Sequence, residues 1–430
     1  MRVALLLNNP FTMDSRSWKL ATSLGAAGHD VTVIARAGGD LPSHEIGAGY
    51  TVLRLAPVRT LGWLPAPGLP AAGAERQRGA GFRGWLRDTL GRAAQAGRYL
   101  LRTRSTATAI ERELAAAHGT RSHGAGDHGP GDPIDIWQAE GLVMLPVALR
   151  LRRRLGGHVV YDSRDIGPQS ARFARLPGSW RRLLARSERG WARAADAIVT
   201  VNRPYAEQLR KAFGRDPLIV ANGPLPFDPP DPPERRFHDR LGLPAGQRVA
   251  VMVGAVVAHR GIELACAAIA DVPATALVVV GDGEAKTRIV AEAARLPQAD
   301  RIHFMPSLPP ADLPAWTAAA DVAVMPIEPS TLNHRLTTPT RLYDAMGAGV
   351  PVVASDLPGM AAVVRETGIG VLVDPTCAAA IAAGIREVLD APPERRAAWR
   401  AACLAAARGP YAWHDGVDRL VALYERLGAR

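Results

Sequence analysis

The sequence predicts an α/β protein built from two doubly wound domains. Short apolar runs alternate with segments of helical length in two series, one on each side of a proline-rich stretch. Strands that are joined through helices run parallel and are buried, which is the arrangement of a doubly wound sheet. The chain has 430 residues, which exceeds the size of about 250–300 residues at which a single hydrophobic core stops growing.

The first series occupies residues 1–223, which we assign to one domain. Val3–Leu7, Ser15–Ala27 and Asp30–Ala35 have the patterns of a strand, an amphipathic helix and a second strand. The further expected elements are strands at Ile134–Gln138, Val159–Asp162 and Ala197–Val201, with helices at about 143–155, 181–194 and 204–213.

Residues 57–133 interrupt this series. Glycine- and proline-rich ends flank an arginine-rich middle, Arg83–Arg112. One interpretation is a helical insertion with a disordered rim, in which 118–131 is a mobile loop. The other is an amphipathic flap that lies on a membrane or grips the acceptor.

A proline-rich stretch at 224–244 divides the two series. Its proline density predicts a stiff linker without helix or central strand. Residues 245–410 then form the second domain, and residues 411–430 form a closing helix that joins the first. The expected strands of the second domain are Val249–Val253, Leu277–Val280, Ile302–Met305, Val322–Met325, Val350–Ala354 and Gly370–Val373.

Charge is distributed unevenly, since residues 1–220 hold 32 Lys and Arg against 18 Asp and Glu, while residues 221–430 hold 20 against 23. The excess either reflects codon bias or indicates an anionic partner, such as a lipid surface or a phosphorylated acceptor. Nucleic acid is not expected, because the basic stretches lack interleaved aromatic residues.

The three cysteines lie far apart, which argues against a disulfide framework and a cysteine zinc site. No apolar run approaches the length of a membrane span, and the N-terminal run is too short for a secretory signal. We therefore expect a cytoplasmic protein.

The first candidate ligand site follows the expected strand at Val249–Val253. Gly254 permits a tight exit, and the next helix would present unpaired N–H groups and a positive dipole end, which favour phosphate. His259 and Arg260 lie in this turn, and Arg260 either meets that phosphate or is an ordinary surface arginine. Gly281 and Gly283 follow the next strand, and their turn either faces a nucleotide or only packs helix on strand.

The strongest candidate is the stretch 337–355. Pro339 can begin a helix, because its missing N–H would be unpaired there anyway. Arg341 and Asp344 are three residues apart and share a helix face. The carboxylate can accept two hydrogen bonds from a ribose diol, while Arg341 and the helix start, with Thr338 and Thr340, meet the phosphates. The alternative is a purely structural Arg–Asp pair.

With these motifs the chain resembles the family-4 retaining glycosyltransferases of the GT-B fold, in which two Rossmann-like domains face a cleft. The resemblance extends nearly end to end, apart from 57–133. The segments that carry it are Asn8–Phe11, Asp14–Arg16, Ala27–Val33, Val280–Gly283, Asp321–Pro326 and, most specifically, Pro339–Ser355.

The resemblance implies that the second domain binds a nucleotide-diphosphate sugar. Arg260 and Arg341 would lie on the diphosphate and Asp344 on the ribose. It also implies retention of the anomeric configuration, no obligatory metal, no cofactor, and an acceptor held mainly by the first domain.

Several positions depart from that family. Its two glutamates eight residues apart are here Leu336 and Asp344, and an arginine common in the first turn is Ala255. The usual histidine after the fourth strand is Glu140, and 161–165 contains no histidine.

Protein groups on the acceptor side therefore have open roles. Glu140 or Asp165 can orient the acceptor hydroxyl, or the leaving phosphate itself takes the proton. Arg16 and Arg164 can hold an acidic acceptor, and Asp14 is a further candidate for acceptor binding. The alternative for each of these side chains is a purely structural role.

We expect a hexosyltransferase that moves a sugar to a lipid-linked, saccharide or small-molecule acceptor. The setting would be cell-envelope, exopolysaccharide or other glycoconjugate biosynthesis at the inner face of the plasma membrane. The alternatives are a nucleotide-sugar 2-epimerase, which shares the fold, and a non-catalytic partner that keeps it.

Overall fold

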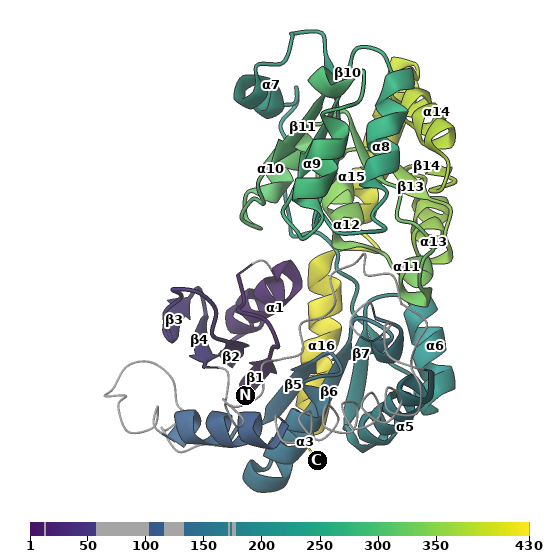
Figure 1. The fold of residues 1–430 in the computed structure, drawn as a ribbon. Coiled ribbons are helices and arrows are strands. Elements are labelled where there is room, and N and C mark those ends of the chain that lie inside the picture. The colour runs from purple at the N-terminus through teal and green to yellow at the C-terminus, as the bar shows by residue number, and fades with distance from the viewer. Residues whose placement is uncertain (13, 57–102, 116–132, 171–172, 174–177, 430) are drawn as a thin grey trace, which may run out of the picture. The chain divides into compact units, whose positions relative to one another are not determined.

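The computed structural model describes residues 1–12, 14–56, 103–115, 133–170, 173 and 178–429. The chain forms two compact units. The first comprises Met1–Thr12, Leu24–Asp162 and Ala194–Asp196, and the second comprises Met13–Ser23, Ser163–Arg193 and Ala197–Arg430. Each unit contains parallel strands linked through helices, which confirms the predicted α/β class (Figure 1).

The first unit is built on strands in the order β3-β4-β2-β1-β5-β6. The pairs β1–β2, β2–β4, β1–β5 and β5–β6 are parallel, and β3–β4 is antiparallel. The chain runs outward from β1 to β2 and then returns to β5 on the other side, so the strand order reverses between β1 and β5. The elements are β1 (Arg2–Leu6), β2 (Asp30–Arg36), β3 (His44–Gly47), β4 (Tyr50–Leu55), β5 (Ile136–Glu140), α3 (Leu145–Leu155), β6 (His158–Ser163) and a helix at 103–115.

The second unit contains a sheet in the order β11-β10-β9-β12-β13-β14, with every pair parallel. Its strands are β9 (Arg248–Val253), β10 (Thr275–Val280), β11 (Ile302–Met305), β12 (Val322–Met325), β13 (Val352–Ser355) and β14 (Gly370–Val373). The unit also contains the parallel strands β7 (Ala197–Thr200) and β8 (Leu218–Ile219).

The remaining helices of the described residues lie wholly or largely in the second unit. They are α1 (Ser15–Ala26), α5 (Gly178–Ala194), α6 (Arg203–Phe213), α7 (Arg236–Leu241), α8 (Ile262–Ala268), α9 (Lys286–Ala293), α10 (Leu313–Ala318), α11 (Leu332–Leu336), α12 (Thr340–Gly347), α13 (Pro358–Thr367), α14 (Ala378–Leu389), α15 (Pro393–Arg408) and α16 (Trp413–Gly428), with 3₁₀ turns at Gly167–Gln169, Ile269–Asp271 and Ala299–Arg301.

Both faces of the second sheet are buried under helices. Val249 and Val251 of β9 belong to a core that includes residues of α12, α13 and α15. Ala250 and Met252, which point the other way, belong to a core with residues of α8, α9 and α14. Because alternate residues of a strand face opposite sides, this division places one helical layer on each face, as a doubly wound sheet requires.

The expectation that 224–244 contains no helix is wrong, because α7 lies within it. No proline interrupts residues 234–243, and Gly242 ends the helix with φ 66°. Phe237 is fully buried, and its ring lies 5.2 Å from that of Trp316, so tertiary packing holds this short helix.

The hairpin β3–β4 was not predicted either, since β3 is mostly exposed and has no apolar run. Of the insertion at 57–133, the structure describes 103–115, which is helical, and 133; the expectations for 57–102 and 118–131 lie outside the described residues. No helix in the described ranges is both long and apolar enough to cross a bilayer.

Candidate functional site

The second sheet reverses its strand order between β9 and β12. From β9 the chain moves to β10 and β11, whereas β12 leads to β13 and β14 on the other side. Open α/β sheets bind ligands at the carboxyl ends of the strands at such a point. The turns after these two strands touch, since a Cβ on Gly261 would lie 2.0 Å from the carbonyl oxygen of Pro326.

Arg341 of α12 reaches the end of β9. Its Nη1 donates to the carbonyl oxygen of Val253 at 2.7 Å. A Cβ on Gly254 would lie 3.3 Å from the same nitrogen, and Gly254 has φ +125°, so glycine suits this position on both counts. Burial and then the nearby charge of Arg260 lower the pKa of Arg341, while the charge of Asp344 raises it. The guanidinium nevertheless stays protonated at the pH values considered below.

The glycine turn at 281–283 lies directly on the turn after β9. A Cβ on Gly281 would meet the carbonyl oxygen of Gly254 at 1.9 Å, and one on Gly283 would meet that of Val256 at 2.3 Å. Close backbone approach therefore explains both glycines, and their contact with the nucleotide stays a prediction.

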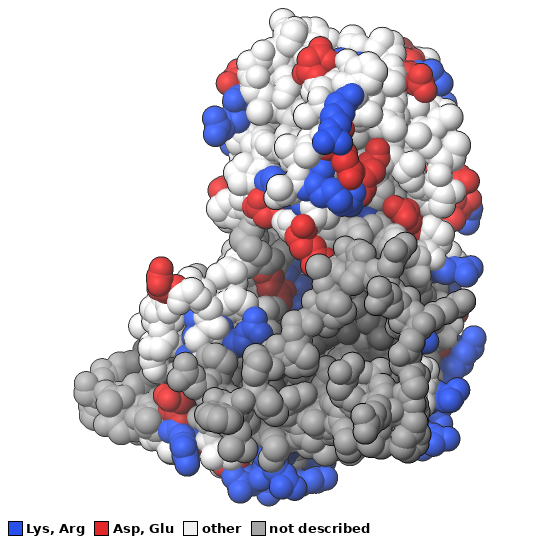
Figure 2. Space-filling model, in the orientation of Figure 1, with Lys and Arg blue, Asp and Glu red and all other residues white. Residues whose placement is uncertain are grey.

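Arg260 supplies a second guanidinium near Arg341. Its Nε is buried and has no hydrogen-bond partner in the described parts of the chain. Burial lowers its pKa, while Asp165 and Tyr205 oppose that shift. Elsewhere on this unit cations pair with carboxylates, as in Lys286–Asp282 at 2.7 Å, and Figure 2 shows basic and acidic side chains side by side.

A histidine pair adjoins Arg260. His259 has φ 64°, and its Nδ1 lies 3.0 Å from Oε2 of Glu328. The ring of His334 lies 6.4 Å from that of His259, and its Nδ1 lies 2.8 Å from Oγ of Ser330. Burial lowers the pKa of His334 to about 4, and Arg260 and His259 contribute, so this imidazole is neutral at pH 7.

Asp165 is held near Arg260 by its own loop. Asn333 of α11 accepts from Ile166 N at 2.9 Å and donates to Ile166 O at 3.3 Å. Residue 165 is exposed at the surface, but neighbouring atoms partly desolvate its carboxylate, and this desolvation raises the pKa of Asp165. The positive charges of Arg164 and Arg260 act in the opposite direction and lower that pKa.

Asp344 lies one helical turn beyond Arg341 in sequence, and the charge of Lys19 of α1 acts on it. Burial raises the pKa of Asp344 to about 6, and the charges of Lys19 and Arg341 oppose the rise. The carboxylate thus lies in the field of two cations, in the middle of the helix that also carries Arg341.

The two predicted threonines make packing contacts at the start of α12. Thr338 Oγ1 donates to Gly359 O at 3.1 Å and accepts from Asn202 at 3.0 Å. Thr340 Oγ1 accepts from Asn222 Nδ2 at 3.3 Å. Contact between either threonine and a phosphate stays a prediction.

Three predicted acceptor residues are engaged with protein groups. Arg164 Nη1 donates to Asp14 Oδ1 at 3.0 Å, and its Nη2 donates to Ser17 at 2.8 Å. Arg16 is 3% exposed, and its Nη1 donates to the Val220 carbonyl at 2.8 Å. Their roles toward an acceptor remain predictions.

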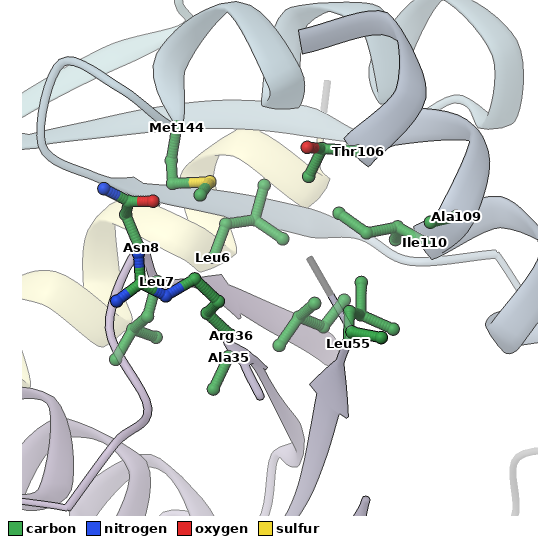
Figure 3. A pocket seen from close by; sticks show the side chains of 12 residues that line it. Leu6, Leu7, Asn8, Ala35, Arg36, Leu55, Thr106, Ala109, Ile110 and Met144 are labelled. Atoms are coloured by element: carbon green, nitrogen blue, oxygen red, sulfur yellow. The ribbon is translucent and has the colours of Figure 1, made fainter. Parts of the chain in front are cut away.

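Glu140 ends β5 in the first unit, where it accepts from Gln138 Nε2 at 2.8 Å. The same unit contains a pocket at the carboxyl ends of β1, β2 and β4. Figure 3 shows apolar side chains around it, with Asn8 and Arg36 at one end; the apolar residues include Leu6, Leu55, Ile110 and Met144.

The sequence analysis missed Lys19, Tyr205 and Asn333. Tyr205 Oη donates to Asn333 O at 3.1 Å, in the contact that supports the loop of Asp165. A signal for Lys19 existed: the chain has only three lysines, and this one lies one turn after Arg16. Within the described residues no group of three or more His, Cys, Asp or Glu is placed to hold a metal ion.

Comparison with known proteins identifies the family to which the chain belongs. Residues 233–403 match the family described as glycosyl transferases group 1, and this range includes Gly254, Arg260, Arg341 and Asp344. The chain is 30% identical to a GDP-mannose-dependent alpha-(1-6)-phosphatidylinositol monomannoside mannosyltransferase of Mycolicibacterium smegmatis, over 65% of this chain and 81% of that protein.

Other relatives match over a shorter range. A D-inositol 3-phosphate glycosyltransferase of Segniliparus rotundus is 30% identical over 54% of this chain and 52% of its own length, so the chain spans about half of that relative. The solved structure of Anabaena Alr3699/HepE in complex with UDP-glucose matches the fold with a TM-score of 0.68 at 16% identity, over 99% of this chain and 100% of that one. The predicted GT-B architecture of two Rossmann-like domains is thereby confirmed, and the chain belongs to the group 1 glycosyltransferase family.

Proposed function

We propose that the protein is a retaining glycosyltransferase of family 4 that transfers a sugar from a nucleotide-diphosphate sugar to an acceptor. The observation that carries the proposal is the placement of Arg341 on the glycine turn after β9, at the strand-order reversal, with Arg260 nearby and Asp344 one turn further along α12. These groups match the charges and hydroxyls of a nucleoside diphosphate.

The chemistry follows from where charge develops. Cleavage of the anomeric C–O bond leaves negative charge on the departing diphosphate. Arg260 and Arg341 are fixed cations that would stabilise this charge more in the transition state than in the ground state. The leaving phosphate oxygen takes the acceptor proton on the same face, and Asp165 or Glu140 orients the acceptor hydroxyl. We propose that the reaction needs neither a metal nor a cofactor.

For the donor we propose a UDP- or GDP-linked sugar, because the Anabaena neighbour is described with UDP-glucose and the mycobacterial relative as GDP-mannose-dependent. For the acceptor we propose the pocket of the first unit (Figure 3). It lies at the carboxyl ends of β1, β2 and β4, beside the reversal of strand order between β1 and β5. Its apolar lining and Arg36 suit a partly apolar, anionic acceptor, and the two curated relatives act on inositol phosphate or phosphatidylinositol mannoside by name. We place this reaction in cell-envelope or exopolysaccharide biosynthesis.

A membrane-facing location fits α5. Arg182, Arg186 and Arg189 are exposed and recur at helical spacing, and Leu183 is 53% exposed. We propose that this helix lies against an anionic membrane surface on the cytoplasmic side.

The test is nucleotide release from a panel of UDP- and GDP-sugars, with EDTA present in a parallel series. We expect release with at least one donor, undiminished by EDTA, and loss of release in Asp344→Asn. Failure to bind any donor contradicts the proposal. Conversion of the nucleotide sugar without an acceptor would indicate a 2-epimerase, and tight binding without release would indicate a non-catalytic partner.

A further inference from the structure

Two buried cations of α1 bind one short segment of backbone. Arg16 and Lys19 are each 3% exposed. Arg16 Nη1 donates to Val220 O at 2.8 Å and to Asn222 Oδ1 at 2.7 Å. Lys19 Nζ donates to Asn222 O at 3.0 Å and to Gly223 O at 2.7 Å, and it lies 4.5 Å from the ring centroid of Trp413.

The same segment, 220–224, lies against α12. Asn222 Nδ2 donates to Thr340 Oγ1 at the start of that helix. At its other end, a Cβ on Gly347 would lie 2.5 Å from Cβ of Pro224. The segment is therefore fixed between α1 and α12, and a small movement of one helix is transmitted to the other.

The charged groups around Asp344 come from two helices. The charges of Lys19 on α1 and Arg341 on α12 act on Asp344, while that of Arg16 acts on Lys19 and that of Arg260 acts on Arg341. On the neighbouring α15, Arg400 donates to the carbonyls of Pro229 and Pro230, at 3.5 and 3.3 Å.

We propose that Lys19 is a positioning residue of the nucleotide site: its ammonium holds the 220–224 segment on α12 and supplies the positive charge that balances Asp344. The inference rests on the proposed function, because it takes Asp344 as the ribose-binding carboxylate. It assigns a role in donor binding to a residue of α1.

The two groups have ionisations that bracket neutral pH. Burial raises the pKa of Asp344 to about 6 and lowers that of Lys19 to about 8. Below about pH 6 the carboxyl binds a proton and loses its strength as an acceptor, and above about pH 8 the amine loses its charge. Donor affinity should therefore be bell-shaped, falling about tenfold per pH unit beyond each limit.

Calorimetric titration with UDP-glucose and GDP-mannose, from about pH 5 to about pH 9, tests this. Their diphosphate diesters do not ionise in that range. In Lys19→Met we expect affinity near pH 7 to fall about tenfold, the acid limb to move to higher pH and the alkaline limb to disappear. Lys211→Met, the same change at an exposed lysine of α6, should keep the wild-type profile.

Lys19→Arg keeps the test decisive if Lys19→Met does not fold. Arginine stays charged throughout this range, so near-normal affinity without an alkaline limb is expected. An alkaline limb that persists in Lys19→Arg, or a Lys19→Met protein that matches Lys211→Met, overturns the inference alone. A wild-type protein that binds neither nucleotide sugar overturns the proposed function and this inference with it.

Discussion

At the scale of single residues, Arg260 is the most informative side chain. A buried polar atom without a partner costs free energy of about 1–3 kcal/mol, and Arg260 Nε is such an atom among the described residues. A guanidinium held in this state beside a second one, Arg341, is arranged to receive an anion. The diphosphate of a nucleotide sugar has the required charge and geometry.

Replacing Arg260 by alanine should therefore remove transition-state stabilisation. We expect sugar transfer to fall about 10²–10³-fold, the loss typical of one fixed donor at a developing charge. Arg335→Ala is the matched control, since Arg335 is an exposed arginine on α11. Steady-state rates of nucleotide release measure the effect, and equal rates in the two variants would contradict the assignment.

His334 should make stability depend on pH. Its pKa in the folded protein is about 4, below the ordinary 6.5, so the unfolded chain binds more protons between these values. The contribution is fully present above about pH 6.5 and is lost as pH falls towards about 4. His334→Asn should reduce this acid-induced loss by about 1 kcal/mol, allowing for partial exposure. Urea unfolding at several pH values measures this loss of folding stability. The prediction is wrong if the variant loses as much stability on acidification as the wild type.

At the scale of elements, the turn after β9 joins backbone geometry to the site. Gly254 allows both the left-handed backbone and the approach of Arg341 to Val253 O. The turn at 281–283 rests on it through two further glycines. The local fold therefore fixes the guanidinium before any ligand arrives, which is the condition for electrostatic stabilisation without rearrangement.

Gly254→Ala should disturb both stability and donor binding. Backbone strain of this kind costs about 1–3 kcal/mol, and the added Cβ displaces Arg341 from Val253. Gly246→Ala is the control, because its Cβ would meet nothing within 4 Å. Thermal unfolding and donor titration together give the result, and a Gly254→Ala protein as stable and as tightly binding as Gly246→Ala refutes this role of the turn.

The helices and strands also show which parts of the fold can be predicted from the sequence alone. A strand that is buried along its whole length, such as β10, can be predicted from the sequence because it forms an apolar run. Arg341 and Asp344 were identified because their spacing on one helix is local information. In contrast, α7 depends on Phe237 meeting Trp316, and β3 is exposed and exists through pairing with β4. The tie between Lys19 and Asp344 joins residues far apart in the chain, which no local pattern reveals.

At the scale of the whole molecule, two units each contain a sheet whose strand order reverses once. In the second unit this point carries the guanidinium pair, and in the first unit the pocket with Arg36 adjoins it. Basic side chains of the first half include the exposed arginines of α5. The second unit thus carries the guanidinium pair and the basic face of α5, and the first unit carries the apolar pocket.

The basic surface makes a prediction about membranes. Changing Arg182, Arg186 and Arg189 to glutamine should weaken binding to vesicles that contain anionic lipid, by about 1 kcal/mol for each arginine. Binding should also fall as salt rises. Sedimentation with anionic and neutral vesicles measures this. Equal retention of the variant and the wild type on anionic vesicles would exclude α5 as the contact.

The most direct test of the central claim is a crystal structure of the protein with an intact nucleotide sugar. We expect the ribose hydroxyls on the Asp344 carboxylate and the diphosphate oxygens within hydrogen-bond distance of Arg260 and Arg341. A nucleotide bound with its diphosphate away from both guanidinium groups, or seated in the pocket of the first unit, would contradict the account.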